Sequence, residues 1–224
     1  MGKLYIVPTP IGNLNDITLR GIEILSKVDW IICEDTRRTN ILLKNFKIKN
    51  KKLISYYSPK ENDKIENILR ILSQNDMVLV VDSGMPAISD PGYKLIKSCI
   101  ERSFEFEVLP GPSAILTALV ASGINPARFL FLGFLPKKGL SNFLKRFKTL
   151  DNITFIFFEN TLRIFKTLKL IYEIFGDCDV FIAREISKIY EQYLRGDLNT
   201  ILKKLKSEKL KGEITVVFSK IKKG

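Results

Sequence analysis

The sequence contains no histidine in its 224 residues. This absence excludes histidine general bases, the Ser-His-Asp and Cys-His catalytic arrangements, and histidine-ligated zinc. Cysteine is scarce as well, since only Cys33, Cys99 and Cys178 are present and none belongs to a CxxC motif. Their odd number, wide spacing and apolar neighbours predict reduced, buried thiols. Only Glu34 and Asp35 are adjacent acids without a neighbouring lysine, so we predict no metal site.

Long apolar runs are missing too. Residues 153–158, for example, are followed at once by Glu159, whereas a bilayer span needs ~20 apolar residues. No apolar stretch follows Met1–Lys3 as it would in a signal peptide, so we expect a soluble, cytoplasmic protein without a membrane partner. Neither GxxxxGK(S/T) nor GxGxxG occurs, which argues against a P-loop NTPase and a common dinucleotide-binding fold.

Positive charge, in contrast, is in excess. The 36 Lys and Arg residues outnumber the 24 Asp and Glu residues, giving a formal net charge of +12. A charge of this size indicates a polyanionic partner, either nucleic acid or an anionic membrane face. Basic clusters lie at 137–138, 145–148 and 203–206, and five lysines lie between 44 and 52. Each cluster alone is typical of a solvated surface, but together they favour contacts with RNA phosphates.

Apolar segments rich in Ile, Val and Phe alternate with segments of helical period along the whole chain. This alternation is typical of mainly parallel sheets covered by helices. We predict an α/β protein with two α/β domains, residues 1–112 and 113–224. In the first domain, we predict strands at 4–7, 28–33, 53–56, 77–81 and 104–109, and helices at 18–27, 37–46, 61–74 and 92–102. In the second, we predict strands at 128–133, 153–158, 180–183, 189–194 and 214–218, and helices at 113–121, 141–150, 161–175 and 198–205.

Three loops rich in glycine and proline each follow a predicted strand of the first domain, at residues 8–13, 82–92 and 110–114. In an open parallel sheet, ligands bind outside the carboxyl ends of the strands, so these loops can converge on one cleft. Each loop alone is also explained as an ordinary strand-to-helix turn, but the three together favour a ligand site. Because Asp82 and Asp90 would repel phosphate, a ligand with ammonium, hydroxyl or sulfonium groups is favoured.

Charged residues follow two further strands. Asp35 is suited to capping the next helix, whereas Arg37 lies where its charge opposes the helix dipole. Either an anionic partner or an ion pair with Glu34 or Asp35 explains Arg37. In the second domain, Glu159 ends a strand and Arg163 opens a helix. For Arg163, pairing within the domain and binding of substrate are equally supported.

The chain resembles the ribosomal RNA small subunit methyltransferase I group of the tetrapyrrole methylase superfamily. The resemblance extends from residue 4 to about residue 218. It implies two α/β domains with S-adenosylmethionine in the cleft between them, 2′-O-methylation of a cytidine ribose in the decoding centre of 16S rRNA within the 30S subunit, and a homodimer. The matching segments are 4–14, 16–18, 34–37, 82–92, 110–114, 133–136, 183–185 and 211–213.

The resemblance also implies where the site lies. The backbone at 83–85 and 88 is expected to meet the methionine part of the cofactor, and residues 113–114 its ribose or adenine. The implied cofactor-binding residues are Pro8, Pro10, Gly12, Asp82, Ser83, Gly84, Met85, Ile88, Ser113 and Ala114. Without histidine, a carboxylate must accept the proton of the 2′-hydroxyl, or a cation must stabilise the alkoxide. The candidate catalytic residues, among which the sequence does not choose, are Glu34, Asp35, Arg37, Glu159 and Arg163.

Two positions depart from the pattern of the relatives. They usually carry Thr at the position of Met85 and His at the position of Leu162, so neither binding through that hydroxyl nor catalysis by that histidine is possible here. Two other functions stay open: a tetrapyrrole methylase of the same superfamily, and a non-catalytic RNA-binding protein that has kept the fold. The wide spread of basic charge argues against the first, and the intact loops at 82–92 and 110–114 argue against the second.

Overall fold

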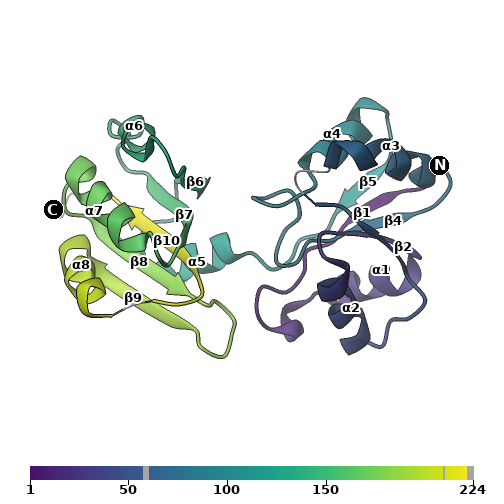
Figure 1. The fold of residues 1–224 in the computed structure, drawn as a ribbon, viewed down its shortest axis with the longest axis horizontal. Helices are drawn as coiled ribbons and strands as arrows, with labels where there is room; N and C mark the ends of the chain where they lie inside the picture. The colour runs from purple at the N-terminus through teal and green to yellow at the C-terminus, as the bar shows by residue number, and fades with distance from the viewer. Residues whose placement is uncertain (58–60, 209, 221–224) are drawn as a thin grey trace. The chain divides into compact units, whose positions relative to one another are not determined.

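The computed structural model describes residues 1–57, 61–208 and 210–220. They form two compact units, Met1–Ser113 and Ala114–Gly224, which we call unit 1 and unit 2. Each unit contains one five-stranded sheet with helices packed on it (Figure 1), so the predicted α/β class is confirmed. The division between the units falls one residue after the predicted boundary. Within the described ranges, no helix is long and apolar enough to cross a membrane.

Unit 1 is built on a fully parallel sheet. Its strands are β1 (Leu4–Ile6), β2 (Trp30–Cys33), β3 (Lys52–Ser55), β4 (Met77–Leu79) and β5 (Phe106–Val108). Its helices are the short 3-10 helix η1 (Leu14–Asp16), α1 (Leu19–Lys27), α2 (Thr36–Asn45), α3 (Glu61–Leu72) and α4 (Tyr93–Glu101). The strand order is β3-β2-β4-β1-β5, and each neighbouring pair is parallel.

Two apolar clusters cover the two faces of this sheet. Leu4 and Ile6 of β1 belong to the cluster formed with α3 and α4. Tyr5 and Val7, which alternate with them, pack in the cluster formed with α1 and α2. Figure 1 shows these two helix pairs on opposite sides of the sheet. Burial on both faces explains why the strands are continuously apolar rather than alternating.

Unit 2 is built on a mixed sheet, so the predicted mainly parallel pairing is wrong for this unit. Its strands are β6 (Phe129–Phe134), β7 (Thr154–Asn160), β8 (Asp179–Arg184), β9 (Gln192–Asp197) and β10 (Glu213–Ser219). Its helices are α5 (Ala114–Ser122), α6 (Leu140–Lys145), α7 (Ile164–Phe175) and α8 (Leu198–Ser207). The strand order is β6-β7-β10-β8-β9. Only β6 and β7 pair in parallel among these neighbours, and the other three pairs are antiparallel.

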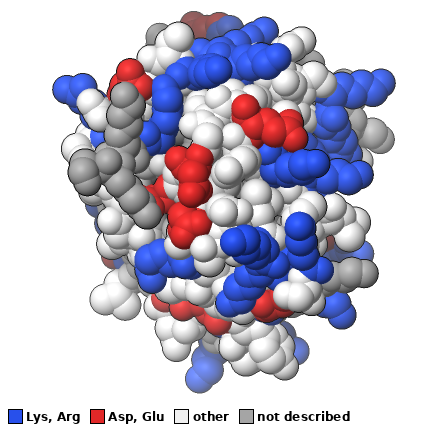
Figure 2. Space-filling view, turned by 90° about the vertical axis from the view of Figure 1, so that its left-hand side faces the viewer, with Lys and Arg blue, Asp and Glu red and all other residues white. Residues whose placement is uncertain are grey.

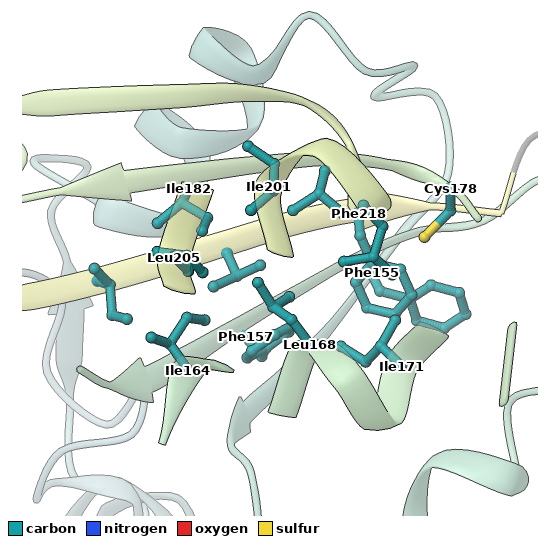
Figure 3. Packing of buried hydrophobic residues seen from close by; sticks show 14 of the residues in the cluster. Phe155, Phe157, Ile164, Leu168, Ile171, Cys178, Ile182, Ile201, Leu205 and Phe218 are labelled. Carbon is teal, nitrogen blue, oxygen red and sulfur yellow. The ribbon is translucent and has the colours of Figure 1, made fainter. Parts of the chain in front are cut away.

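The helices α6, α7 and α8 pack on one face of the second sheet around an aromatic-rich core. Phe155, Phe157 and Phe218 are fully buried there, together with Leu168 of α7 (Figure 3). The rings of Phe155 and Phe218 stack with their centroids 4.9 Å apart. Helix α5 instead lies against β7, β8 and β10, and Arg195 of β9 donates hydrogen bonds to carbonyl oxygens at the end of that helix.

The predicted state of the cysteines is confirmed. Cys33, Cys99 and Cys178 are free and buried. Burial raises the pKa of the Cys99 thiol to about 11 and that of the Cys178 thiol to about 12. Both thiols therefore remain protonated at neutral pH, which makes them poor nucleophiles.

The predicted strand at 189–194 is wrong at its start, because β9 begins only at Gln192. Glu185 and Ser187 adopt positive φ angles of 53° and 65°, so the chain turns before the strand can begin. Ile189 is 95% exposed on this turn. As an apolar, β-branched residue it favours a strand prediction, but its side chain contributes nothing to the core.

Two leucine-to-alanine substitutions near α7 test this description of the core. Leu168→Ala removes a fully buried side chain, and we expect it to lower the free energy of unfolding by about 2–5 kcal/mol. Leu162→Ala makes the same chemical change at a side chain that is 90% exposed, and we expect an effect within about 0.5 kcal/mol. Urea unfolding of both variants makes the comparison, and equal losses would contradict the assigned core.

Candidate active site

The carboxyl ends of three strands of unit 1 lie at one edge of the sheet. Strand β4 pairs in parallel register with β1 on one side and β2 on the other. The loops that begin at Val7, Glu34 and Val80 therefore leave the sheet side by side. This is the edge where ligands bind in open parallel sheets, and it carries most of the residues predicted for the site.

The loops after β1 and β4 are joined by a short antiparallel bridge. The N–H of Thr9 donates to the carbonyl oxygen of Gly84, and the N–H of Gly84 donates to that of Thr9, both at 3.0 Å. The buried Thr9 hydroxyl also donates to the carbonyl oxygen of Val81 at 2.9 Å. Gly84 has a φ of 82°, which glycine adopts readily and other residues adopt only under strain. The bridge therefore holds the loops after β1 and β4 in a fixed position relative to each other.

The loop after β5 packs against the loop after β1. A Cβ atom placed on Gly111 would lie 2.8 Å from Cβ of Pro8, closer than two such atoms can approach. Glycine at position 111 is therefore required for this approach of backbone to side chain. The predicted convergence of the three loops is present in unit 1.

The loop at 82–92 adopts a strained conformation. Ala87 and Ser89 have positive φ angles of 70° and 65°, each of which costs about 1–2 kcal/mol for a residue with a side chain. The Ala87 N–H donates to the carbonyl oxygen of Pro91 at 3.1 Å, which closes the loop. Met85 is half-buried, and Ile88 is 44% exposed. Backbone strain of this kind gathers at ligand-binding loops.

Two carboxylates reach across from neighbouring strands. The N–H of Asp35 donates a hydrogen bond to Oδ1 of Asp82 at 3.2 Å. The N–H of Asp82 donates a hydrogen bond to Oε2 of Glu34 at 3.4 Å. Burial raises the pKa of Glu34 and of Asp82, and the nearby negative charges add to this effect. A carboxylate with a raised pKa accepts a proton more effectively near neutral pH.

Asp35 and Arg37 form an ion pair at the start of α2. Asp35 caps the helix by accepting the N–H of Arg37 at 2.8 Å. The Arg37 guanidinium donates to the same carboxylate through Nε and Nη2, the latter at 2.6 Å. These bonds lower the pKa of Asp35 to about 2. Of the two explanations for Arg37, the ion pair with Asp35 is therefore observed. The Arg37 side chain is 88% exposed.

Arg38, which is not among the predicted catalytic residues, lies beside the half-buried carboxylates of Glu34 and Asp82. Its Nε atom is 3.4 Å from Oδ2 of Asp82, and it lines a surface pocket of about 160 Å³. A signal for it was available in the helical period, because Arg38 lies one turn before the buried Leu42. The residues lining the pocket are Thr9, Pro10, Leu14, Arg38, Thr39, Ile41, Leu42, Val81 and Asp82.

Glu159 and Arg163 are brought together in unit 2. The Glu159 side chain is almost fully buried and accepts a hydrogen bond from the Thr167 hydroxyl at 2.6 Å. Arg163 lies 3.5 Å from the same carboxylate and donates to the carbonyl oxygens of Leu135 and Pro136 at 3.1 and 3.0 Å. These contacts tie the ends of β6 and β7 to α7. A catalytic role for either residue stays a prediction.

The remaining predicted residues lie in the loops after β1 and β4, at the last residue of unit 1 and at the first residue of unit 2. Pro8 is buried, Pro10 half-buried and Gly12 exposed in the loop after β1, while Ser83 is half-buried in the loop after β4. Ser113 is the last residue of unit 1, and Ala114 opens α5 in unit 2. Their roles in cofactor binding stay predictions.

Comparison with known proteins assigns the chain to a family. Residues 3–202 match the model of the Tetrapyrrole (Corrin/Porphyrin) Methylases. The chain is 49% identical to the ribosomal RNA small subunit methyltransferase I of Hydrogenobaculum sp. (strain Y04AAS1), over 97% of this chain and 96% of that protein. It is 45% identical to the protein of the same name from Thermotoga maritima, over 98% and 99% of the two chains.

Solved structures share the fold at lower identity. Cobalt precorrin-4 methyltransferase has a TM-score of 0.70 at 16% identity, over 97% of this chain and 94% of that one. Uroporphyrin-III C-methyl transferase from Thermus thermophilus, complexed with S-adenyl homocysteine, has a TM-score of 0.69 at 15% identity, over 97% of both chains. The resemblance seen in the sequence motifs is thus confirmed. The chain belongs to the tetrapyrrole methylase family and, within it, to the ribosomal RNA small subunit methyltransferase I group.

Proposed function

We propose that this chain uses S-adenosylmethionine to methylate the 2′-hydroxyl of a cytidine ribose in the decoding centre of 16S rRNA, within the 30S subunit. Relatives at 42–49% identity named as rRNA methyltransferases support rRNA methylation. The observation that carries the proposal is the cluster of Glu34, Asp82 and Arg38 beside the three converging loops. The family resemblance also supports a cytoplasmic homodimer, which is part of the same proposal.

The residues at this edge of unit 1 fit a sulfonium cofactor. Glu34 and Asp82 supply negative charge, which attracts a sulfonium or ammonium group and would repel a nucleotide phosphate. The strained backbone around Ala87 and the exposed Ile88 give the 82–92 loop a conformation suited to holding a ligand. When bound, S-adenosylmethionine supplies a methyl group already attached to a good leaving group. The solved relative complexed with S-adenyl homocysteine supports this choice.

Within this site we propose Glu34 as the proton acceptor. Its Oε2 atom lies near the Asp82 N–H, whereas its Oε1 atom accepts no hydrogen bond from any described residue. Asp82 is occupied by the Asp35 N–H and by Arg38. The Arg38 guanidinium can stabilise negative charge that develops on the ribose oxygen. The rest of the rate enhancement comes from holding the hydroxyl in line with the methyl group.

The other candidate catalytic residues support this geometry from a distance. Asp35 and Arg37 fix the first turn of α2 and thereby position Arg38. Glu159 and Arg163 fix the strand ends of unit 2. We propose that all four are positioning residues.

Methyl transfer to 30S subunits tests the proposed function against its two rivals. Isothermal titration with S-adenosylmethionine should show heat of binding, and labelled methyl should appear on a cytidine 2′-oxygen of 16S rRNA. Absence of binding heat would indicate an RNA-binding protein without catalytic activity. Methylation of uroporphyrinogen but not of rRNA would indicate a tetrapyrrole methylase, whose small acidic substrate does not require basic charge over many segments.

Glu34→Gln tests the assigned base. We expect kcat to fall by roughly 10²–10⁴-fold while the Kd for S-adenosylmethionine is unchanged. Because burial raises the pKa of Glu34 above its ordinary value of 4.5, wild-type kcat should fall as the pH drops through that raised pKa. The variant should lack this acidic limb.

Glu23→Gln is the matched control, since Glu23 is exposed on α1 in the same unit. It should retain wild-type kcat and the same pH profile. An acidic limb that persists in Glu34→Gln would show that another group accepts the proton.

Gly84→Ala tests the cofactor loops, with Gly139→Ala as its control. Both glycines have left-handed φ angles, 82° and 70°, so each substitution should cost about 1–2 kcal/mol in stability. Only Gly84 lies in the loops predicted to bind the cofactor. Only its substitution should therefore weaken S-adenosylmethionine binding by about tenfold or more. Titration calorimetry on folded samples makes the measurement. Equal cofactor affinity in the two variants would remove the 82–92 loop from the site.

A further inference from the structure

The net charge of the protein is divided unevenly between its two units. Residues 1–113 contain 16 Lys and Arg against 14 Asp and Glu, a net charge of +2. Residues 114–224 contain 20 against 10, a net charge of +10. Unit 2 therefore carries nearly all of the positive charge that indicated a polyanionic partner.

The basic residues of the two units also differ in their partners. In unit 1, many cations are neutralised within the fold, as Arg20 is by Glu107 at 2.8 Å and Lys97 by Glu101 at 3.7 Å. In unit 2, the helices α6, α7 and α8 carry six lysines and a single acid, Glu173. All six lysines are exposed, and within the described ranges none of their side-chain ammonium groups forms an ion pair or hydrogen bond. They are Lys145, Lys166, Lys169, Lys203, Lys204 and Lys206.

These six lysines share one layer of the unit. Helix α7 contacts α6 and α8, and the apolar sides of all three helices pack into the core of unit 2. The exposed lysines consequently occupy the outer side of the layer. Figure 2 views this side of the molecule and shows Lys and Arg at many points around a smaller group of Asp and Glu. We call the outer side of these three helices the basic helical layer.

Helix stability does not account for this arrangement. Lys166 lies in the first turn of α7, where a positive charge opposes the helix dipole. On α8, Lys203 and Lys206 are three residues apart, a spacing at which like charges repel each other. Lys145, in the last turn of α6, and Lys204 and Lys206, in the last turn of α8, are favoured by the dipole. Several of these charges therefore oppose helix formation, and an anionic partner would offset their repulsion.

We infer that the basic helical layer of unit 2 binds phosphates of the RNA substrate away from the nucleotide that is methylated. This inference rests on the proposed function and assigns a surface to it. A membrane surface fits less well, because a membrane-bound amphipathic helix exposes large apolar residues beside its cations. On α8 the residues exposed beside the lysines are Asn199, Thr200 and Ser207, which suit contact with a sugar–phosphate backbone.

The experiment compares two triple substitutions that remove the same charge. The test variant is Lys203→Gln with Lys204→Gln and Lys206→Gln on α8. The control is Lys27→Gln with Arg70→Gln and Lys97→Gln, three exposed cations of unit 1 outside the clusters predicted to contact RNA. Single-turnover and steady-state methylation of 30S subunits, S-adenosylmethionine affinity and melting temperature are measured for both.

The α8 variant should raise KM for 30S subunits by about tenfold or more, whereas kcat and cofactor affinity should equal those of the wild type. Its plot of log KM against log salt should be shallower by roughly 0.7–0.9 for each phosphate that the variant no longer neutralises. Its melting temperature should change little, because the repulsion that is removed offsets the lost dipole interaction of Lys204 and Lys206. The control should change KM by less than about twofold.

Other outcomes overturn the inference. A wild-type KM for the α8 variant, or an equal rise in both variants, would show that the layer has no special part in RNA binding. Loss of binding to phosphatidylserine vesicles with an unchanged KM for 30S subunits would assign the layer to membranes. If the wild-type protein transfers no methyl to 30S subunits, the proposed function fails separately. In that case, filter binding of 16S rRNA tests the basic helical layer. Weaker RNA binding by the α8 variant than by the control would support the inference, and equal binding would contradict it.

Discussion

The parallel pairing of β4 with both β1 and β2 is the constraint on which the site depends. It places three strand ends at one edge, where the reciprocal hydrogen bonds between Thr9 and Gly84 join two of the loops. Because β2 is the other neighbour of β4, Glu34 and Asp82 reach each other's backbone. Their partial burial, and hence their raised pKa values, follow from the same pairing.

Much of this arrangement could be predicted from the sequence, and the rest required packing. Apolar strands and Gly/Pro loops are local signals, so the fold class and the converging loops could be predicted. The choice between Arg37 and Arg38 depends on which guanidinium Asp35 captures at the helix start, which the sequence does not specify. The buried position of Glu159 likewise depends on the hydrogen bond that it accepts from Thr167 of α7, which the sequence does not reveal. The start of the strand predicted at 189–194 is wrong because the sequence does not distinguish an exposed isoleucine, such as Ile189, from a buried one.

In the proposed reaction, the two units would contribute different physical properties. Unit 1 is nearly neutral overall and supplies the strand ends, the strained loop and the paired carboxylates. Unit 2 supplies a mixed sheet whose helical layer is strongly and openly basic. Chemistry on a ribose needs acids near the reacting atom, but binding of RNA needs cations near phosphates. The paired carboxylates and most of the excess positive charge therefore lie on different units.

The most direct test of the account is mass spectrometry of 16S rRNA nucleosides from cells with the gene, without it, and with it restored. The account predicts a 2′-O-methylcytidine in the decoding centre that is present, absent and present again in the three samples. The modification should also form in vitro when purified protein and S-adenosylmethionine are added to 30S subunits from the strain lacking the gene. A 2′-O-methylcytidine level that is the same in all three cell samples would contradict the proposed function.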